Sequence, residues 1–329
     1  DAAAAMASAT VVGDDVAGTI TAAFGRVTDA TAEAGDGDVV VIVNDAANVA
    51  QAATIAAATT GQVDFAGITD TAAAMASVAA VGEVAAGTIT TAFSTATTAG
   101  AANGDGATAV TVNTAANVAQ AGTIAQATTG AVQFTAGIAD DIDAMVAEGA
   151  ATAAFGFATD GTAGAGDGDV AVTVANAVTV AEAVVVAGAT SGTLDFTTGI
   201  SGLVATMANG EGAVAADFET VADRDTDIKV VVTDTLNVAQ AATISSETTG
   251  QVDFSNAAGI TDDIGNLVNG ENNASDNLVT ATATGSTNGD DDVNVTVNNA
   301  VTVAQAKAVA GATSGTLDFT TGISGLVAT

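Results

Sequence analysis

One phrase recurs five times along this chain, and any fold that the chain adopts must accommodate the recurrence. It reads "AGDGDVVVIVND" at residues 34–45 and returns as "NGDGATAVTVNT", "AGDGDVAVTVAN", "DRDTDIKVVVTD" and "NGDDDVNVTVNN". The equivalent positions, which follow one another at intervals of 69, 62, 58 and 65 residues, are Asn44, Asn113, Ala175, Thr233 and Asn298. A period of this size predicts an array of repeated units, each of which buries its apolar surface against its neighbours.

The alignment of the five copies also predicts where each repeat begins and ends. Residues 1–34 end a preceding unit, and repeats follow at 35–103, 104–165, 166–223, 224–288 and, incomplete, 289–329. The first residues, "DAAAAM", match "GLVATM" in the third repeat, and the chain closes inside the same phrase. We therefore expect an excerpt of a longer protein whose copies meet head to tail, as one repeat meets the next.

Each repeat opens with a strand and continues with a helix. The Val-rich stretch "DVVVIV" alternates in the manner of a largely buried strand, and the Asn or Asp at or beside the equivalent position suits a helix N-cap. The Ala-rich segment "NDAANVAQAATIAAATTG" then predicts a helix of about fifteen residues that ends at Gly61. The matching segment of the third copy is richer in Val and favours a strand, so a strand stays open as the alternative.

The second half of the conserved region adds a short strand and a second helix. In "QVDF", Val63 and Phe65 share one face and Asp64 takes the other, and a strand–helix–strand order predicts a parallel crossover. A short helix follows in "TDTAAAMAS", and in early copies a Thr-rich strand such as "AGTITTAF". The predicted fold is an α/β repeat array of strand–helix–strand–helix units stacked into an elongated, solenoid-like rod, with an all-β solenoid as the alternative.

Composition excludes several classes of function. The chain carries 38 acidic residues against 4 basic ones, a net charge of −34, which repels nucleic acid and anionic membranes. A hydrophobic fraction of 49% is too high for a disordered acidic tail, yet no run reaches the length of a membrane span. His, Cys, Tyr and Trp are absent, which removes imidazole bases, thiolates and most aromatic platforms. We expect a protein that is not an enzyme, binds no nucleic acid and does not insert into membranes.

The repeated aspartates are the candidate site. Carboxylates on a glycine-containing loop are ligands that Ca²⁺ prefers, so the loops predict calcium binding at every copy. An equally simple interpretation is that Asp and Gly only form the turn before the strand. The candidate metal ligands are Asp36, Asp38, Asp105, Asp167, Asp169, Asp225, Asp227, Asp290 and Asp292.

Three further patterns have simpler interpretations. The Phe residues in register with Phe65 are expected in the core. The polar residues at one helix position, Gln51 and its four counterparts, are expected to contact the neighbouring unit. The sequons at Asn273 and Asn294 permit glycans as partners.

The phrases "NVAQAATI", "TTGQVDF" and "TSGTLDF" resemble the repeats of very large secreted bacterial proteins. These are the acidic, Cys-free surface-layer, adhesin and fibre proteins of aquatic bacteria, notably cyanobacteria. The resemblance implies an extracellular or cell-surface protein with a common need for calcium. We therefore expect a structural protein that forms a fibre, sheath or surface layer with copies of itself, and as the alternative the rigid stalk of a calcium-dependent adhesin.

Overall fold

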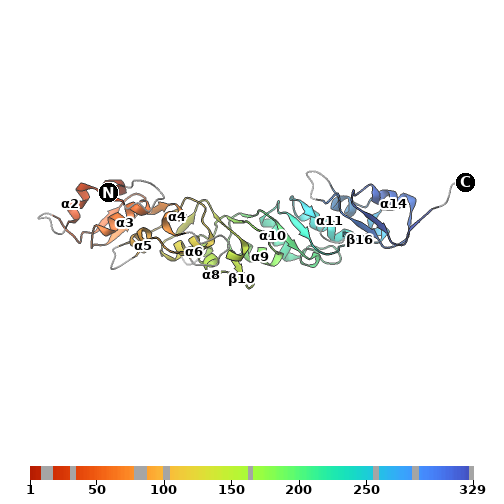
Figure 1. Ribbon diagram of the computed structural model, residues 1–329, viewed down its shortest axis with the longest axis horizontal. Coiled ribbons are helices and arrows are strands. Elements are labelled where there is room, and N and C mark those ends of the chain that lie inside the picture. Colours follow the sequence, from red (N-terminus) through yellow and green to blue (C-terminus); the bar gives the residue numbers. More distant parts are fainter. Residues whose placement is uncertain are drawn as a thin grey trace. The chain divides into compact units, whose positions relative to one another are not determined.

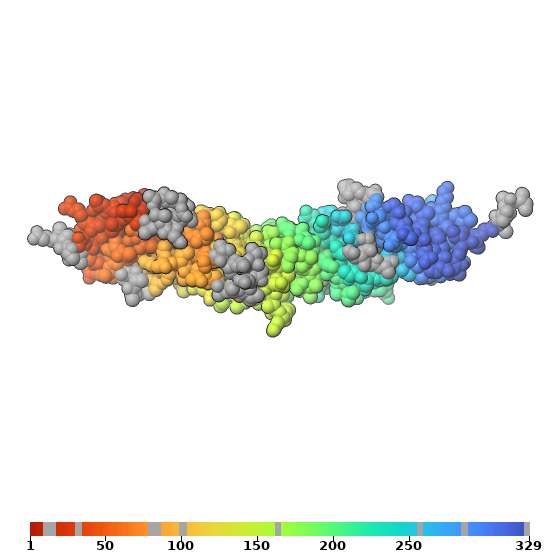
Figure 2. Space-filling view, viewed as in Figure 1, coloured from red at the N-terminus to blue at the C-terminus, as the bar shows by residue number. Residues whose placement is uncertain are grey.

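The computed structural model describes residues 1–8, 18–29, 35–77, 87–98, 104–161, 166–254, 259–283 and 289–325. The chain divides into two compact units, one of residues 1–173 with 188–193 and the other of residues 174–187 with 194–329. Within each unit short helices alternate with short strands (Figure 1). Within each unit, too, segments that follow one another in the sequence lie side by side (Figure 2).

Strand, helix and strand recur in every copy. The Val-rich strands are β3 (Val41–Val43), β6 (Val110–Val112), β11 (Val172–Val174), β14 (Val230–Val232) and β17 (Val295–Val297). The long helices are α3 (Val49–Ala57), α6 (Val118–Gln126), α9 (Val180–Ala189), α11 (Val238–Glu247) and α14 (Val303–Ala310). The strands that carry or adjoin the aligned Phe are β4 (Val63–Phe65), β7 (Val132–Phe134), β12 (Leu194–Phe196), β15 (Val252–Asp253) and β19 (Leu317–Phe319).

The two strands that flank each long helix are paired in parallel, as the crossover predicted. The structure gives this pairing for β3 with β4, β6 with β7, β14 with β15 and β17 with β19. Their side chains alternate: in β4, Val63 and Phe65 are buried and Asp64 is exposed. The aligned Phe side chains are buried in the first four repeats, which confirms the core prediction there, whereas Phe319 is only half-buried.

A third strand and two more helices complete the repeat. The third strands, which begin with Ile, are β5 (Ile68–Asp70), β8 (Ile138–Asp140), β13 (Ile200–Gly202), β16 (Ile260–Asp262) and β20 (Ile323–Ser324). Single-turn helices are α1 (Ala3–Met6), α4 (Ala72–Met75), α7 (Ile142–Met145), η1 (Val204–Thr206) and α12 (Ile264–Leu267). The helix that follows each single-turn helix in the chain is called the outer helix below; these are α2 (Ala22–Thr28), α5 (Thr91–Thr97), α8 (Ala153–Thr159), α10 (Ala216–Arg224) and α13 (Asp276–Ala281).

Neighbouring repeats share sheets. Strand β5 pairs in parallel with β6 of the following repeat, and β6 pairs in turn with its own β7. The same order recurs as β13–β14–β15 and as β16–β17–β19. Each three-stranded sheet therefore takes one strand from one repeat and two from the next. The remaining short strands are β1 (Ala7–Ser8), β2 (Thr19–Ile20), β9 (Val146–Ala147), β10 (Ala150–Ala151) and β18 (Val301–Thr302).

The structure is mixed α/β, so the all-β alternative is wrong, and the Ala-rich segment is helical even in the Val-rich third copy. The helix is shorter than predicted, because α3 begins after Asn48, which caps it in a capping box with Gln51, and ends at Ala57. In the described part of the chain no helix has the length and hydrophobicity of a membrane span.

Two other predictions were wrong. Gly61 is not a left-handed helix cap, because its φ is not positive and α3 ends four residues earlier. A Cβ there would overlap the carbonyl oxygens of Asp38 and Val39, so close backbone approach explains the glycine. In "AGTITTAF", whose first residue lies outside the described ranges, Ile89 forms a single bridge and helix α5 begins at Thr91, because Thr90 caps it by accepting the Phe93 N–H.

Candidate functional site at the aspartate loops

In four of the five loops the first aspartate joins two repeats. One carboxylate oxygen of Asp290 accepts the Phe254 N–H of the preceding repeat at 2.6 Å. The same bond has a length of 2.8 Å at Asp225, 2.7 Å at Asp167 and 3.1 Å at Asp105. The Asp side chain thereby satisfies a strand N–H that points away from its own sheet partner. Three of these four aspartates are buried, and Asp105 is half-buried.

The same aspartate also forms the turn that precedes the Val-rich strand. The carbonyl of Asp105 accepts the Thr108 N–H at 3.3 Å, and the second carboxylate oxygen of Asp105 accepts the Ala107 N–H at 3.0 Å. The turn bond recurs in the other four copies, including Asp36. In the four later copies, turn formation and the contact between repeats therefore use different atoms of one residue, which explains why Asp is present there.

Two further carbonyl oxygens of the loop, those of Gly37 and Val39, accept hydrogen bonds. The Gly37 carbonyl accepts the Thr60 N–H at 2.7 Å and the Thr60 hydroxyl at 3.0 Å. The buried Thr59 hydroxyl donates to the Val39 carbonyl at 2.8 Å and accepts the Gly61 N–H at 2.9 Å. Equivalent bonds recur in all five copies. The Thr-Thr-Gly or Thr-Ser-Gly segment after each long helix thus clamps the aspartate loop, and sequence analysis missed this role of the threonines.

The second aspartate, which four of the five loops have, lies in a different environment; the second loop has Ala107 in its place. Asp38, Asp169, Asp227 and Asp292 are exposed. Each lies two residues after the first aspartate of its loop. Burial, reinforced by the neighbouring Asp292, raises the pKa of Asp290 to about 6, and burial with Asp227 does the same for Asp225. Burial also raises the pKa of Asp167, and in the exposed first loop the hydrogen bond and charge of Asp36 raise the pKa of Asp38.

These contacts determine what the loop can offer a cation. Ca²⁺ takes six to eight oxygens. In the four later loops the contact between repeats, called the joint below, engages the first carboxylate, and the threonine clamp engages two carbonyls. The loop of Asp105, with Ala107 in the second place, keeps no exposed carboxylate, the loops of Asp167 and Asp225 keep one each, and the loop of Asp290 keeps Asp291 and Asp292. In the described part of the chain no three acidic side chains come together as a metal-binding group. The geometry therefore does not fit a closed calcium cage within one loop.

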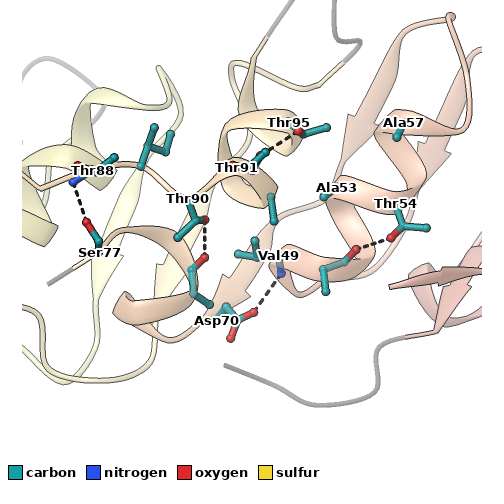
Figure 3. Close-up of a pocket in the computed structure, with 14 residues that line it drawn as sticks. Val49, Ala53, Thr54, Ala57, Asp70, Ser77, Thr88, Thr90, Thr91 and Thr95 are labelled. Carbon is teal, nitrogen blue, oxygen red and sulfur yellow. Dashed lines mark hydrogen bonds between the residues drawn. The ribbon is translucent and has the colours of Figure 1, made fainter. Parts of the chain in front are cut away.

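A second family of aspartates, which sequence analysis missed, caps the long helices. Asp70, at the end of β5, is buried and accepts the Val49 N–H at 3.1 Å (Figure 3). It also accepts the Thr71 N–H at 2.8 Å. Asp140 and Asp262 do the same for α6 and α11. The signal was the repeated "GITD" or "GIAD", in which an acidic residue closes an apolar strand. The groove in Figure 3, about 650 Å³ between α3 and α5, is lined otherwise by Ala, Val, Ile, Ser and Thr.

Other polar contacts also cross from repeat to repeat. The Gln120 side chain donates to the Ala76 carbonyl of the preceding repeat at 3.0 Å, and Gln51 and Gln240 make the same contact, which confirms the prediction for these residues. The polar residue after the equivalent position caps a different helix from the one predicted. Thr114 accepts the Ala72 N–H, the first of α4 in the preceding repeat, whereas Asn117 caps α6.

The caps give a first testable prediction. Replacement of Asp70 by Ala leaves the buried Val49 N–H without its acceptor and should lower the free energy of unfolding by about 1 kcal/mol. The matched control is Asp64→Ala, because Asp64 is exposed on β4 and should change stability by less than about 0.5 kcal/mol. Chemical denaturation measures both. Equal effects of the two substitutions would contradict a capping role.

Comparison of this chain with protein-family models, with curated proteins and with solved structures finds no match.

Proposed function

We propose that this chain is a structural protein of the cell exterior whose repeats assemble into a fibre, sheath or surface layer. One observation carries the proposal: each repeat completes a parallel sheet of the next, as β5 completes the sheet of β6 and β7. An edge that is completed by a neighbour can be extended by further neighbours of the same kind. Continued sharing would extend the array in one direction as a rod.

The residue chemistry supports a structural role over a catalytic one. The chain has neither His nor Cys. Its buried aspartates, such as Asp70 and Asp290, have backbone N–H partners that hold elements together. Such carboxylates are engaged as acceptors and are not free to act as a general base or a nucleophile. The side chains that reach from one repeat to the next are Asp, Thr, Asn and Gln, which form hydrogen bonds with backbone N–H and carbonyl groups.

The charge supports a dependence of assembly on cations. A net charge of −34 opposes the approach of two copies, and the exposed aspartates beside Asp167, Asp225 and Asp290 concentrate that charge. We propose that Ca²⁺ acts here as a neutralising counter-ion bound by exposed carboxylates, including Asp38, Asp169, Asp227 and Asp292. This role needs fewer ligands from one loop than a closed cage does. High salt would screen the same repulsion less specifically.

Electron microscopy of the purified chain tests the proposal. We expect filaments or sheets in millimolar calcium and their dissolution in excess chelator at low ionic strength. Assemblies that persist in chelator would support the structural function but would show that calcium is not needed for it. Single particles at every calcium, salt and protein concentration would contradict self-assembly and favour the alternative, a stalk that projects a binding domain.

A further inference from the structure

A pocket of about 390 Å³ in the second compact unit is lined by one carboxylate and three carboxamides. Its lining residues come mainly from the start of α11, the end of β16, α12 and α13. We call it the amide pocket, after its polar side chains, which are Asn237, Asp262, Asn266 and Asn277. The other lining residues are Gly, Ala or Val. Its volume is at the small end of the range, about 300–1,000 Å³, of pockets that bind small molecules.

The groove in Figure 3 is the matching site of the first repeat, and its chemistry differs from that of the amide pocket. Val49 and Asp70 there correspond to Val238 and Asp262 here, since in both repeats the aspartate accepts the valine N–H at 3.1 Å. Asp70 is buried, whereas Asp262 is half-buried. The carboxylate of the fourth repeat is therefore more open to solvent than its counterpart in the first.

Two asparagines distinguish the fourth repeat from the earlier ones. Asn266 and Asn277 each precede a buried core residue, Leu267 or Leu278. The same two places are held by Ala74 and Ala92 in the first repeat, by Ala144 and Ala154 in the second and by Thr206 and Asp217 in the third. The fold of the repeat therefore does not require a carboxamide at either place, and a different reason for the two asparagines is needed.

Hydrogen bonds hold the polar side chains of the amide pocket in place. One Asp262 carboxylate oxygen accepts the side-chain N–H of Asn266 at 2.7 Å and the Asp263 N–H at 2.8 Å. The other oxygen accepts the Val238 N–H, so three N–H groups engage this carboxylate. Asp262 thus fixes the carboxamide of Asn266 and the start of α11 at the same time.

Several donors and acceptors of the amide pocket remain for a ligand. A carboxamide has two N–H donors and one oxygen that can accept twice. Asn266 uses one N–H, and Asn237 uses one N–H on the Gly210 carbonyl and its oxygen on the Gln240 N–H, both at 2.9 Å. Asn277 is exposed, and its side chain has no hydrogen-bond partner among the described residues. The pocket therefore offers both N–H donors and oxygen acceptors.

We propose that the amide pocket binds a neutral carbohydrate through its hydroxyl groups. A hydroxyl group donates one hydrogen bond and accepts others, and a carboxamide presents a donor and an acceptor side by side. Asn266 and Asn277 can therefore each bond to a pair of neighbouring hydroxyl groups, while Asp262 keeps the Asn266 carboxamide in position. This inference goes beyond self-assembly and does not depend on it. In an assembled array, one weak contact per copy would be strengthened by avidity.

Charged ligands fit the amide pocket less well than a neutral one. Asp262 and the net charge of −34 repel anionic sugars and phosphates. A divalent cation such as Ca²⁺ takes six to eight oxygens, but three N–H groups already engage the only carboxylate of the pocket. A neutral ligand that both donates and accepts hydrogen bonds is left as the best match.

Nuclear magnetic resonance of the full chain, labelled isotopically at the asparagine nitrogens, tests the site. The probes are the methyl glycosides of glucose, galactose, mannose and N-acetylglucosamine, with glucuronic acid as the charged comparison. The test variant carries Asn266→Ala and Asn277→Ala, the residues of the first two repeats, so it is expected to fold. The control is Asn273→Ala, which removes an exposed carboxamide of the same repeat outside the pocket. Titrations are run with chelator at low ionic strength, where the chain is expected to stay unassembled.

We expect at least one neutral glycoside to shift the side-chain amide signals of Asn237, Asn266 and Asn277 to saturation. Because the pocket has no aromatic side chain, the dissociation constant should be about 1 mM. The double variant should bind at least tenfold more weakly, as followed by the remaining Asn237 signal, and the control should bind as the wild type does.

Three outcomes would overturn the proposal. The first is the absence of saturable shifts with all four glycosides, and the second is equal affinity of the wild type and the double variant. The third is saturation of the same signals by glucuronic acid or by calcium alone in the absence of chelator, which would assign the pocket to a charged ligand. None of these results bears on self-assembly, which electron microscopy tests separately.

Discussion

Replacement of Asp290 by Ala should lower the free energy of unfolding by about 2 kcal/mol at pH 5. The substitution removes the acceptor of the buried Phe254 N–H and leaves that group without a partner inside the joint, where water cannot replace it. The free energy is measured at pH 5, because the Asp290 carboxyl is then largely uncharged. At higher pH the substitution would also remove an unfavourable buried charge, which would offset part of the effect of the lost hydrogen bond. Chemical denaturation of the full chain supplies the free energy.

Two matched variants separate the bond from the charge at this loop. Asp292→Ala removes an exposed carboxylate two residues away and should cost less than about 0.5 kcal/mol. Asp290→Asn keeps an oxygen that can accept the Phe254 N–H and should retain most of the stability that Asp290→Ala loses. If Asp290→Asn proves as damaging as Asp290→Ala, the carboxylate has a role that a hydrogen-bond acceptor does not reproduce.

Local patterns predicted the elements that repeat without a gap. The alternation of Val in "DVVVIV" and of Val63 and Phe65 around Asp64 gave the two strands of each crossover and their buried faces. The Ala-rich segment gave the helix between them. These succeed because period and propensity act within a few residues, and burial in the structure agrees with both.

Element ends depended on contacts that a linear pattern does not contain. The long helix begins late because Asn48 and Gln51 form a capping box. The residue expected to cap it, such as Asn299 in the fifth repeat, caps a helix of the preceding repeat. The outer helices were missed because their signal is brief. In α5, Thr90 accepts the Phe93 N–H, and only Phe93, Ala96 and Thr97 are buried. Thr and Phe at that spacing occur as readily in a strand.

For the candidate site, too, the sequence predicted the local feature and missed the contact with a neighbouring repeat. Sequence located the loop aspartates by their recurrence, and Asp36 and its counterparts do form the turn that the simpler interpretation predicted. It did not identify their main partner, because the Phe254 N–H lies 36 residues before Asp290 in another repeat. Recurrence shows that the same residue is needed at one position of every repeat. Only the fold shows that its hydrogen-bond partner lies in the neighbouring repeat.

The stability of the protein should rise as the pH falls from 7.5 to 5. The pKa values of Asp225 and Asp290 are raised to about 6 in the folded state, above the ordinary value of 3.8 that applies in the unfolded chain. The folded protein therefore binds more protons than the unfolded one between these values, and each group adds stability as it is protonated. With allowance for solvent screening, each contributes about 1 kcal/mol, so the two together contribute about 2 kcal/mol.

Asp167, whose pKa is raised for the same reason, adds to this effect in the same direction. The measurement is the free energy of unfolding by chemical denaturation at pH 5, 6 and 7.5 at fixed ionic strength. The control is the double variant Asp225→Asn and Asp290→Asn, which keeps acceptors at both joints and should flatten the pH dependence by about 2 kcal/mol. A wild-type protein that is equally stable or more stable at pH 7.5 would contradict the burial of these carboxyls at the joints. A double variant with an unaltered profile would assign the pH dependence to other groups.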